Sequence, residues 1–288
     1  MKRIVSLHVL LICFLAGCSA VATTPTADPL RPVPTLFPTA AWLPTAPPAP
    51  TAATAVPDTG WIAGRPGIEV RHVRLALAPD QPAAALVIVR IDPDTVRLRV
   101  GYAPDQPRGL RSWFEQQRPL AAINGSFFTQ EYRPAALLIS DGTASGDSYE
   151  GFGGMLAVTP AGGIALRSLR DQPYDPNEPL DQALQSFPML VFPGGVPADI
   201  QDNGQRARRT AIAIDRAGRL LLIVGPTNGF TLRGLAEWLS QSDLEVDRAL
   251  NLDGGSSTGL YLKDGALEEG IDSFSPLPIV LLCYPKQQ

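Results

Sequence analysis

One carboxylate near the C-terminus stands directly before a run of residues with almost no side-chain bulk. It is Asp253 in the stretch NLDGGSSTGL, residues 251–260, where two glycines and three hydroxyl residues follow it. Glycines let a backbone approach a ligand closely, and consecutive loop N–H groups can form a concavity that binds anions. A carboxylate beside such a concavity suits acid–base or nucleophilic work on a substrate with phosphate or sugar. An Asp-Gly turn flanked by serines is the alternative.

The same stretch contains a pattern that elsewhere marks a nucleophilic serine. Residues 255–259 match G-x-S-x-G, but a hydrolase of that kind needs a histidine after the serine in the chain. The two histidines are His8 and His72, and both precede this stretch. Neither Ser256 nor Ser257 is therefore expected to act as a triad nucleophile, which leaves carboxylates as the candidates for chemistry.

Metal chemistry is restricted by the scarcity of histidine and cysteine. Beyond the N-terminal apolar segment the chain has His72, Cys18 and Cys283, which cannot form a tetrahedral zinc site or an internal disulfide of the domain. We expect structural roles for His72 and Cys283. No cofactor is certain, and these residues leave open only an oxygen-ligated divalent cation such as Ca²⁺. Asp147 and Glu150, in a Gly/Ser-rich stretch, are second-tier candidates for a partner carboxylate or for a Ca²⁺ ligand.

Four segments in chain order resemble the motifs of one enzyme family. They are 124–128 (NGSFF), 185–191 (QSFPMLV), 209–212 (RTAI) and 252–258 (LDGGSST). They resemble NGxFF, QSxPxLV, an Arg-Thr pair entering a strand, and LDGGGST of the phosphodiester glycosidase family. The resemblance covers most of the chain from about residue 68 to residue 284. Ser256 departs from it, because it stands where the family has a third glycine.

The resemblance implies a hydrolase that cleaves a sugar at its anomeric carbon from a glycosyl phosphodiester. The partner would be a phosphorylated glycan or sugar phosphodiester. We expect Asp253 to supply the carboxylate, Arg209 to grip the phosphate, and Asn124 to offer its amide to sugar or phosphate. The residues expected to bind substrate around them are Gly125, Ser186, Thr210, Gly254, Gly255, Ser256 and Ser257.

Other interpretations of these residues remain open. Arg209 can pair with an acidic neighbour such as Asp215, and Asn124 can simply serve an Asn-Gly turn. At the level of function, the alternatives are a non-catalytic surface module that binds phosphorylated glycan, and a carboxylate-dependent O-glycosidase whose substrate contains no phosphate.

The N-terminal region has the features of an exported lipoprotein. Residues 1–17 have a basic start and a short apolar run typical of a signal peptide, and Leu15-Ala16-Gly17-Cys18 resembles a lipobox. Residues 18–60 are predicted to be a tether, since residues 19–60 include 10 Pro, 9 Thr and 10 Ala. We therefore expect lipidation at Cys18 and an anchor on the outside of the cell membrane, with the phosphodiester glycosidase-like domain spanning residues 61–288.

The charge of the chain argues against nucleic acid as a partner. Removing residues 1–17 takes away two of the 24 basic residues, which leaves 22 against 28 acidic residues and a net charge of −6. Phosphate-backbone binding needs a basic face instead. The oligomeric state is left undetermined by the sequence.

The expected elements place these motifs in an α+β domain. Alternating or continuous apolar runs predict about ten strands, among them 84–91, 210–215, 220–224 and 249–252. Helices are predicted around 110–117 and from Leu232, with Thr231 as N-cap. Because the strands do not alternate regularly with helices, we expect one large mixed, mainly antiparallel sheet with a few packed helices.

Overall fold

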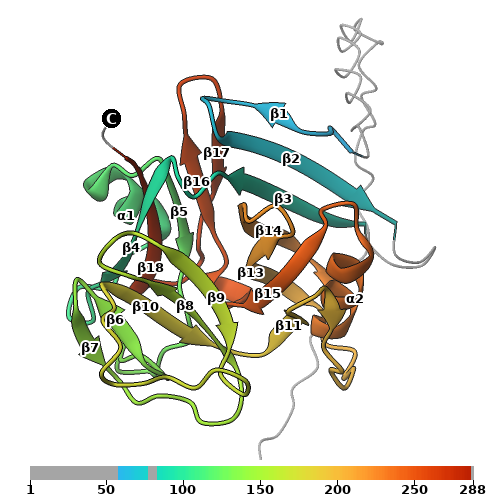
Figure 1. The fold of residues 1–288 in the computed structure, drawn as a ribbon. Helices are drawn as coiled ribbons and strands as arrows, with labels where there is room; N and C mark the ends of the chain where they lie inside the picture. Colours follow the sequence, from blue (N-terminus) through green and yellow to red (C-terminus); the bar gives the residue numbers. More distant parts are fainter. Residues whose placement is uncertain (1–57, 77–82, 287–288) are drawn as a thin grey trace, which may run out of the picture. The chain divides into compact units, whose positions relative to one another are not determined.

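The computed structural model describes residues 58–76 and 83–286, and this part of the chain is largely β. The expected signal peptide, nearly all of the tether and Cys18 lie outside the described residues. Three sheets of antiparallel strands and two α-helices make up the fold of the described part (Figure 1). The expectation of mainly antiparallel strands with few helices is confirmed in outline. The expectation of one large mixed sheet is wrong, because the strands divide among three sheets.

The first sheet has eight strands in the order β1-β2-β3-β14-β13-β15-β11-β12. Its strands are β1 (Ile62–Ala63), β2 (Ile68–Leu75), β3 (Ala84–Ile91), β11 (Met189–Phe192), β12 (Val196–Pro197), β13 (Ala207–Asp215), β14 (Leu220–Phe230) and β15 (Val246–Asn251). The predicted hairpin is formed by β13 and β14, and Gly218 takes a φ of +81° in the turn between them. β13 and β15 also pair, so both adjoin the Asp253 loop.

The other two sheets have five strands each. One has the order β7-β6-β10-β8-β9 and consists of β6 (Leu138–Ser140), β7 (Thr143–Ser145), β8 (Gly154–Val158), β9 (Ile164–Ser168) and β10 (Gln182–Ser186). The other has the order β17-β16-β5-β18-β4 and consists of β4 (Val96–Tyr102), β5 (Ala121–Asn124), β16 (Leu260–Lys263), β17 (Glu268–Ile271) and β18 (Ile279–Pro285).

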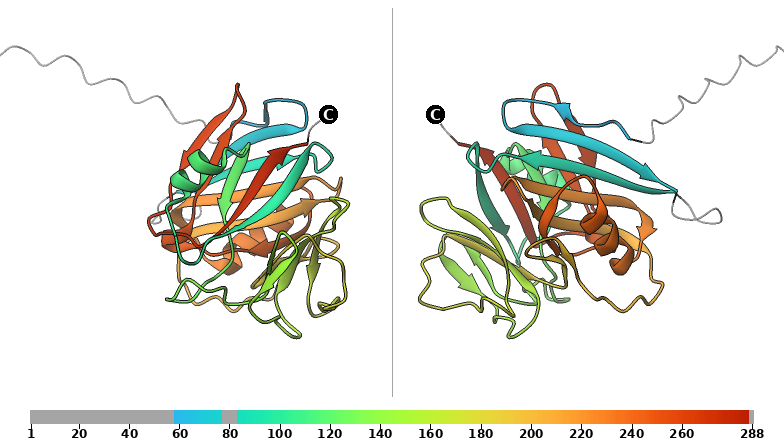
Figure 2. Two further views of the ribbon diagram at one scale, coloured as in Figure 1. Left: turned by 90° about the vertical axis from the view of Figure 1, so that its left-hand side faces the viewer. Right: turned by 45° about the vertical axis from the view of Figure 1, so that its right-hand side comes forward.

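Two α-helices each cover an outer face of a sheet (Figure 2). α2 (Leu232–Gln241) packs against β11, β14 and β15, and α1 (Leu110–Gln117) packs against β5 and β16. The predicted N-cap of α2 is confirmed, because Thr231 Oγ1 accepts a hydrogen bond from Gly234 N–H at 3.0 Å. Neither helix in the described residues combines the length and the apolar character of a membrane span.

The inner faces of all three sheets share one apolar core. Ile212 and Leu222 of the first sheet, Leu156 of the second and Leu281 of the third belong to the same buried cluster. The core holds the sheets in a fixed relation, because close-packed interiors allow little sliding of their elements. As a result the end of β5, the start of β13 and the loop after β15 meet at one place, which contains the predicted site residues.

Candidate active site

Asp253 follows β15, and hydrogen bonds hold its backbone on both sides. Its N–H donates to Gly125 O at 3.1 Å, and its C=O accepts from Asn124 Nδ2 at 2.7 Å. The preceding residue is anchored as well, since Leu252 N–H donates to Thr210 O at 2.9 Å. Two strands that are distant in sequence, β5 and β13, therefore fix the position of this aspartate.

Glycines allow the close backbone contacts that this arrangement requires. A Cβ on Gly125 would lie 2.4 Å from Ile279 Cγ2, and one on Gly254 would lie 2.9 Å from Arg208 O. Gly255 takes a φ of +59°, in the left-handed region that favours glycine, and opens the 3₁₀ turn η1 (Gly255–Ser257). The two glycines after Asp253 thus allow a tight loop that packs against Arg208 of β13.

The carboxyl group of Asp253 is half-buried at this loop. Its Oδ1 accepts a hydrogen bond from Gly254 N–H at 2.8 Å. Burial raises the pKa of Asp253 above the ordinary carboxyl value, and hydrogen bonds from Ser257 and Gly254 oppose that shift. Within the described residues no cation contributes to the shift. A desolvated carboxyl group of this kind can exchange a proton or face positive charge that develops on a substrate.

Asn124 is fully buried beneath this loop, and its amide is used within the protein. Its Oδ1 accepts from Thr210 Oγ1 at 2.8 Å and from Gly259 N–H at 3.1 Å, while its Nδ2 donates to Asp253 O. Thr210 Oγ1 also lies 3.2 Å from Thr258 Oγ1. The structure therefore brings Asn124 and Thr210 together with Asp253, but as buried groups that position the loop.

The structure does not bring the side chain of Arg209 to this loop. Its guanidinium donates from Nε to Phe230 O at 3.1 Å and from Nη2 to Gln205 O at 2.8 Å. Burial lowers the pKa of Arg209. Thr210 contacts Asn124 from the neighbouring position, and successive side chains of a strand point to opposite faces. The expectation that Arg209 and Thr210 both face the substrate is therefore incompatible with this strand.

Arg208, which was not among the residues predicted from the sequence, is the arginine whose backbone lies against the Asp253 loop. Its Nη2 donates to Asp272 O at 2.9 Å, and its guanidinium carbon lies 4.0 Å from the ring centroid of Phe274. The residue is only 6% exposed, and its Nε and Nη1 have no partner within the described part of the chain. Burial lowers the pKa of Arg208, and the Asp272 carboxylate opposes that shift. The alternation of side chains along a strand could have indicated Arg208, because it stands two residues before Thr210 and such residues share a face.

The hydroxyl residues after Asp253 connect this loop to the segment that carries Phe274. Ser256 O accepts from Phe274 N–H at 2.7 Å, and Ser275 Oγ donates to Ser256 Oγ at 3.2 Å. Ser257 Oγ lies 3.4 Å from the same Ser275 hydroxyl. Phe274 is 78% exposed, so it covers the Arg208 guanidinium from the solvent side.

Ser186 occupies a different environment at the end of β10. Its side chain is fully buried, and its hydroxyl has no partner among the described residues. The ring of the next residue, Phe187, lies 4.9 Å from the ring of Phe127, measured between centroids. Because Phe127 follows Gly125 by two positions, an aromatic wall adjoins the Asp253 loop. No local pattern predicted the contact between Phe127 and Phe187, because it joins segments that are far apart in the chain.

The remaining candidates lie away from Asp253 or make structural contacts. His72 on β2 lies beside Glu269, with 2.9 Å between Nε2 and Oε1. Cys283 is fully buried, and burial raises its pKa to about 12. Asp147 and Glu150 are exposed in the loop before β8. In residues 58–76 and 83–286, no group of three or more His, Cys, Asp or Glu side chains is arranged to hold a metal ion.

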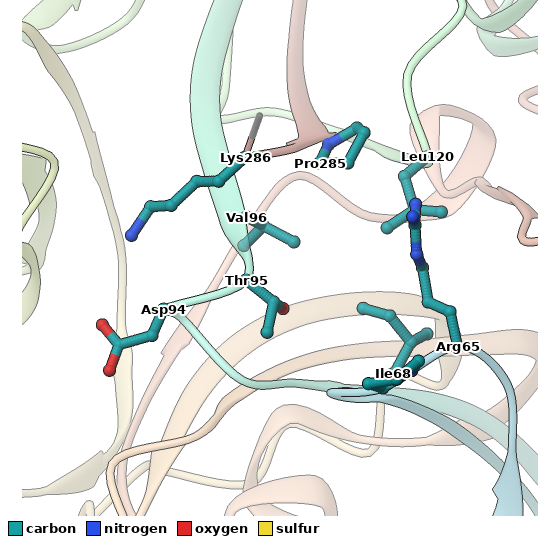
Figure 3. Close-up of a pocket in the computed structure, with 9 residues that line it drawn as sticks. Arg65, Ile68, Asp94, Thr95, Val96, Leu120, Pro285 and Lys286 are labelled. Atoms are coloured by element: carbon teal, nitrogen blue, oxygen red, sulfur yellow. The ribbon is translucent and has the colours of Figure 1, made fainter. Parts of the chain in front are cut away.

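A cavity of about 740 Å³ lies elsewhere, at the opposite end of β5 (Figure 3). Arg65 lies on one side of it, and Asp94 and Lys286 on the other. It reaches Leu120, which precedes β5, whereas Asn124 ends that strand, about 13 Å away at 3.3 Å per residue. This cavity is therefore separate from the Asp253 loop, despite its large volume.

Comparisons with known proteins agree with the arrangement of these motifs. Residues 117–278 match the sequence profile of the family described as phosphodiester glycosidase. This match covers more than half of the chain, so the protein belongs to the phosphodiester glycosidase family. The resemblance seen in the four sequence motifs is thereby confirmed. Among curated proteins no match was found.

Solved structures share the fold at low sequence identity. The zebrafish N-acetylglucosamine-1-phosphodiester alpha-N-acetylglucosaminidase catalytic domain, auto-inhibited by its pro-peptide, matches with a TM-score of 0.61 and 19% identity over 77% of this chain and 84% of that chain. A hypothetical protein from Synechocystis matches with a TM-score of 0.56 and 17% identity over 76% of this chain and 62% of that chain. A Burkholderia pseudomallei protein described as exported matches with a TM-score of 0.50 and 14% identity over 73% and 76%.

Proposed function

We propose that this protein hydrolyses a glycosyl phosphodiester and releases the sugar from a cell-surface or extracellular glycan. One observation carries the proposal: the loop of the half-buried Asp253 carboxyl group is bonded through Ser256 to Phe274, which covers the buried guanidinium of Arg208, and the Nε and Nη1 of this arginine have no partner among the described residues. Gly254, which follows Asp253, also packs against the backbone O of Arg208. A carboxylate for the sugar and a cation for the phosphate are the two groups that this reaction needs.

In the proposed reaction, water attacks the anomeric carbon directly or after a covalent intermediate. A new bond forms between the water oxygen and this carbon, and the bond from the carbon to the phosphate oxygen breaks. The phosphate monoester leaves with the electron pair, and because its second pKa is about 6 it needs little protonation. Asp253 stabilises the positive charge on the sugar ring, activates the water, or acts as the nucleophile. Its fixed backbone keeps the carboxyl group in one place during these steps.

We assign phosphate binding to Arg208 instead of Arg209. A buried guanidinium is costly unless an anion compensates it. The Asp272 carboxylate offsets part of the effect of burial on Arg208, but no carboxylate in the described residues forms an ion pair with it. Its Nε and Nη1 leave two donors for phosphate oxygens. Arg208→Ala should lower kcat/KM about 100-fold and relieve inhibition by inorganic phosphate. A larger loss in Arg209→Ala than in Arg208→Ala would reverse this assignment.

Synthetic methyl diesters of glucose, mannose and N-acetylglucosamine 1-phosphate, in both anomeric forms, test the activity. The wild-type protein should release free sugar from at least one of them, and Asp253→Asn should be slower by about 100-fold or more. Hydrolysis in ¹⁸O-labelled water identifies the bond that breaks. The label should enter the sugar, whereas label in the phosphate would show a phosphodiesterase and overturn the proposal.

The same experiments separate the alternative functions. A non-catalytic module that binds phosphorylated glycan would bind these diesters without releasing sugar. An O-glycosidase would cleave aryl glycosides that lack phosphate, and inorganic phosphate would not compete. Near-normal turnover by Asp253→Asn would remove Asp253 from the mechanism while leaving the activity itself intact.

We also propose that the protein is exported and anchored through a lipid on Cys18. The support comes from the sequence of residues 1–18, with its basic start, short apolar run and lipobox-like end. A multiply acylated cysteine would hold the protein firmly at the membrane, since one chain alone binds only marginally. Globomycin, which blocks lipoprotein signal cleavage, should cause the precursor to accumulate. Normal processing in its presence would argue against the anchor.

A further inference from the structure

A second cavity, of about 340 Å³, is lined in part by Phe187, and its lining includes no residue of the Asp253 loop. Phe187, Phe152 and Phe192 contribute aromatic walls, and Ser168, Arg170 and Asp199 contribute polar groups. These residues come from β9, β11 and the loops around β8, β10 and β12. The proposed reaction uses none of them.

The aromatic residues of this cavity are unusually exposed for their type. Phe152 is 50% exposed and Phe187 is 41% exposed, and their ring centroids lie 6.2 Å apart at an interplanar angle of 74°. Tyr149 packs on Phe152 with 4.6 Å between centroids. Exposed aromatic rings that cluster at a concavity are typical of ligand-binding surfaces, because water wets them poorly.

Polar groups among these rings indicate what the cavity holds. Ser168 is 2% exposed, and its hydroxyl has no partner in the part of the chain that the structure describes. The Arg170 guanidinium lies 4.6 Å from the ring centroid of Phe192 and pairs with Asp171 at 3.3 Å. A sugar ring can place its C–H face on an aromatic side chain and use its hydroxyls with Ser168, Arg170 and Asp199. An alkyl chain would offer the buried Ser168 hydroxyl no hydrogen-bond partner, which costs free energy.

The cavity is coupled to the candidate active site through Phe187. One face of this residue contacts Phe127, beside the Asp253 loop. Its backbone O accepts from Asn251 Nδ2 at 2.9 Å, and Pro188 O accepts from Asn251 N–H at 3.0 Å. Asn251 precedes Asp253 by two residues, so one short segment borders both the cavity and the carboxylate.

We infer that this cavity is a subsite for a further sugar residue of the glycan that carries the scissile phosphodiester. This inference rests on the proposed function, but its test does not require turnover. Trisaccharides of glucose, mannose and N-acetylglucosamine, without phosphate, are titrated into the protein by calorimetry. We expect at least one of them to bind. Phe152→Ala should weaken that binding about tenfold, which is the effect of losing one aromatic stacking contact.

Ser168→Ala separates a binding role of the serine from a structural one. Because its hydroxyl has no partner among the described residues, its removal should leave the melting temperature unchanged or higher. The affinity for the trisaccharide should nevertheless fall about three- to tenfold, as for the loss of one hydrogen bond. Ile62→Ala is the matched control, since Ile62 is exposed on β1 and does not line the cavity.

The outcomes distinguish this inference from the proposed function. No binding of any trisaccharide, or equal affinities in wild type, Phe152→Ala and Ser168→Ala, would overturn the subsite. Absence of sugar release from every phosphodiester would overturn the function while leaving saccharide binding measurable. If both hold, Phe152→Ala should lower kcat/KM about tenfold for a phosphodiester extended by two sugars, and leave the short methyl diester unaffected.

Discussion

Asn124 offers a sharp test of how the Asp253 loop is held in place. Replacing it with alanine removes the acceptor for Thr210 Oγ1 and Gly259 N–H and the donor to Asp253 O. All three bonds are at 2.7–3.1 Å, and the side chain is fully buried. The alanine variant therefore leaves three polar groups without their partner at the base of the loop.

The size of the effect follows from these three hydrogen bonds. Each contributes about 1 kcal/mol net, and a buried group left without a partner costs about 1–3 kcal/mol. We expect Asn124→Ala to lower the free energy of unfolding by about 3–5 kcal/mol. For a domain of this size that loss corresponds to a fall in melting temperature of about 10 °C.

Urea unfolding, followed by far-UV circular dichroism, measures this loss, provided that the slope with urea is unchanged. A double-mutant cycle with Thr210→Val isolates the contribution of the hydroxyl group that donates to Asn124 Oδ1. The double variant should lose less than the sum of the single losses, by about 1 kcal/mol. A loss below about 1 kcal/mol in Asn124→Ala, or strict additivity in the cycle, would refute the view that Asn124 supports the loop.

Three further predictions address other features of the described residues. Burial raises the pKa of Asp253, so ionisation of this carboxyl group costs stability in the folded state. Wild type should therefore lose stability relative to Asp253→Asn as the pH rises from 3.8, the ordinary value, through the raised pKa. Urea titrations of both proteins across that range measure the difference in their free energies of unfolding. A difference that changes in the opposite direction would contradict this prediction. Gly125→Ala should cost about 1–3 kcal/mol, because the added Cβ would approach Ile279 Cγ2 to 2.4 Å; an unchanged thermal unfolding curve would exclude this clash. Cys283, buried with a pKa of about 12, should resist iodoacetamide until the protein unfolds, and rapid alkylation in native buffer would show that it is accessible.

Local sequence signals predicted those elements whose formation depends on nearby residues. The apolar spacing from Leu232 and the capping residue Thr231 predicted α2, and the structure has both. The apolar run 84–91 became β3. β10 was not predicted, because its five buried residues include Gln182 and Gln185. Gln182 Oε1 accepts from Val100 N–H at 3.0 Å, so a polar side chain is satisfied by another sheet, which no local pattern reveals.

The candidate site shows the same division between local and distant information. The motif around Asp253 was recognisable because a carboxylate, glycines and hydroxyl residues adjoin one another in the chain. The sequence did not show which of Arg208 and Arg209 lies against this loop, because both belong to one run of basic residues. A shift of one residue in a strand turns a side chain to the other face of the sheet. Only the packing of β13 against the Asp253 loop shows which of the two arginine side chains lies on the face toward that loop.

The sequence by itself therefore predicted the family and the glycine-rich loop that carries Asp253. These features depend on residue types and on short spacings, which the chain displays directly. Tertiary structure alone decided that Asn124 is buried beneath the loop, that Arg208 lies against it, and that the rings of Phe152 and Phe187 share one cavity. The physical reason is that these relations arise when three sheets close on a common core, and so bring together residues that are far apart in the chain.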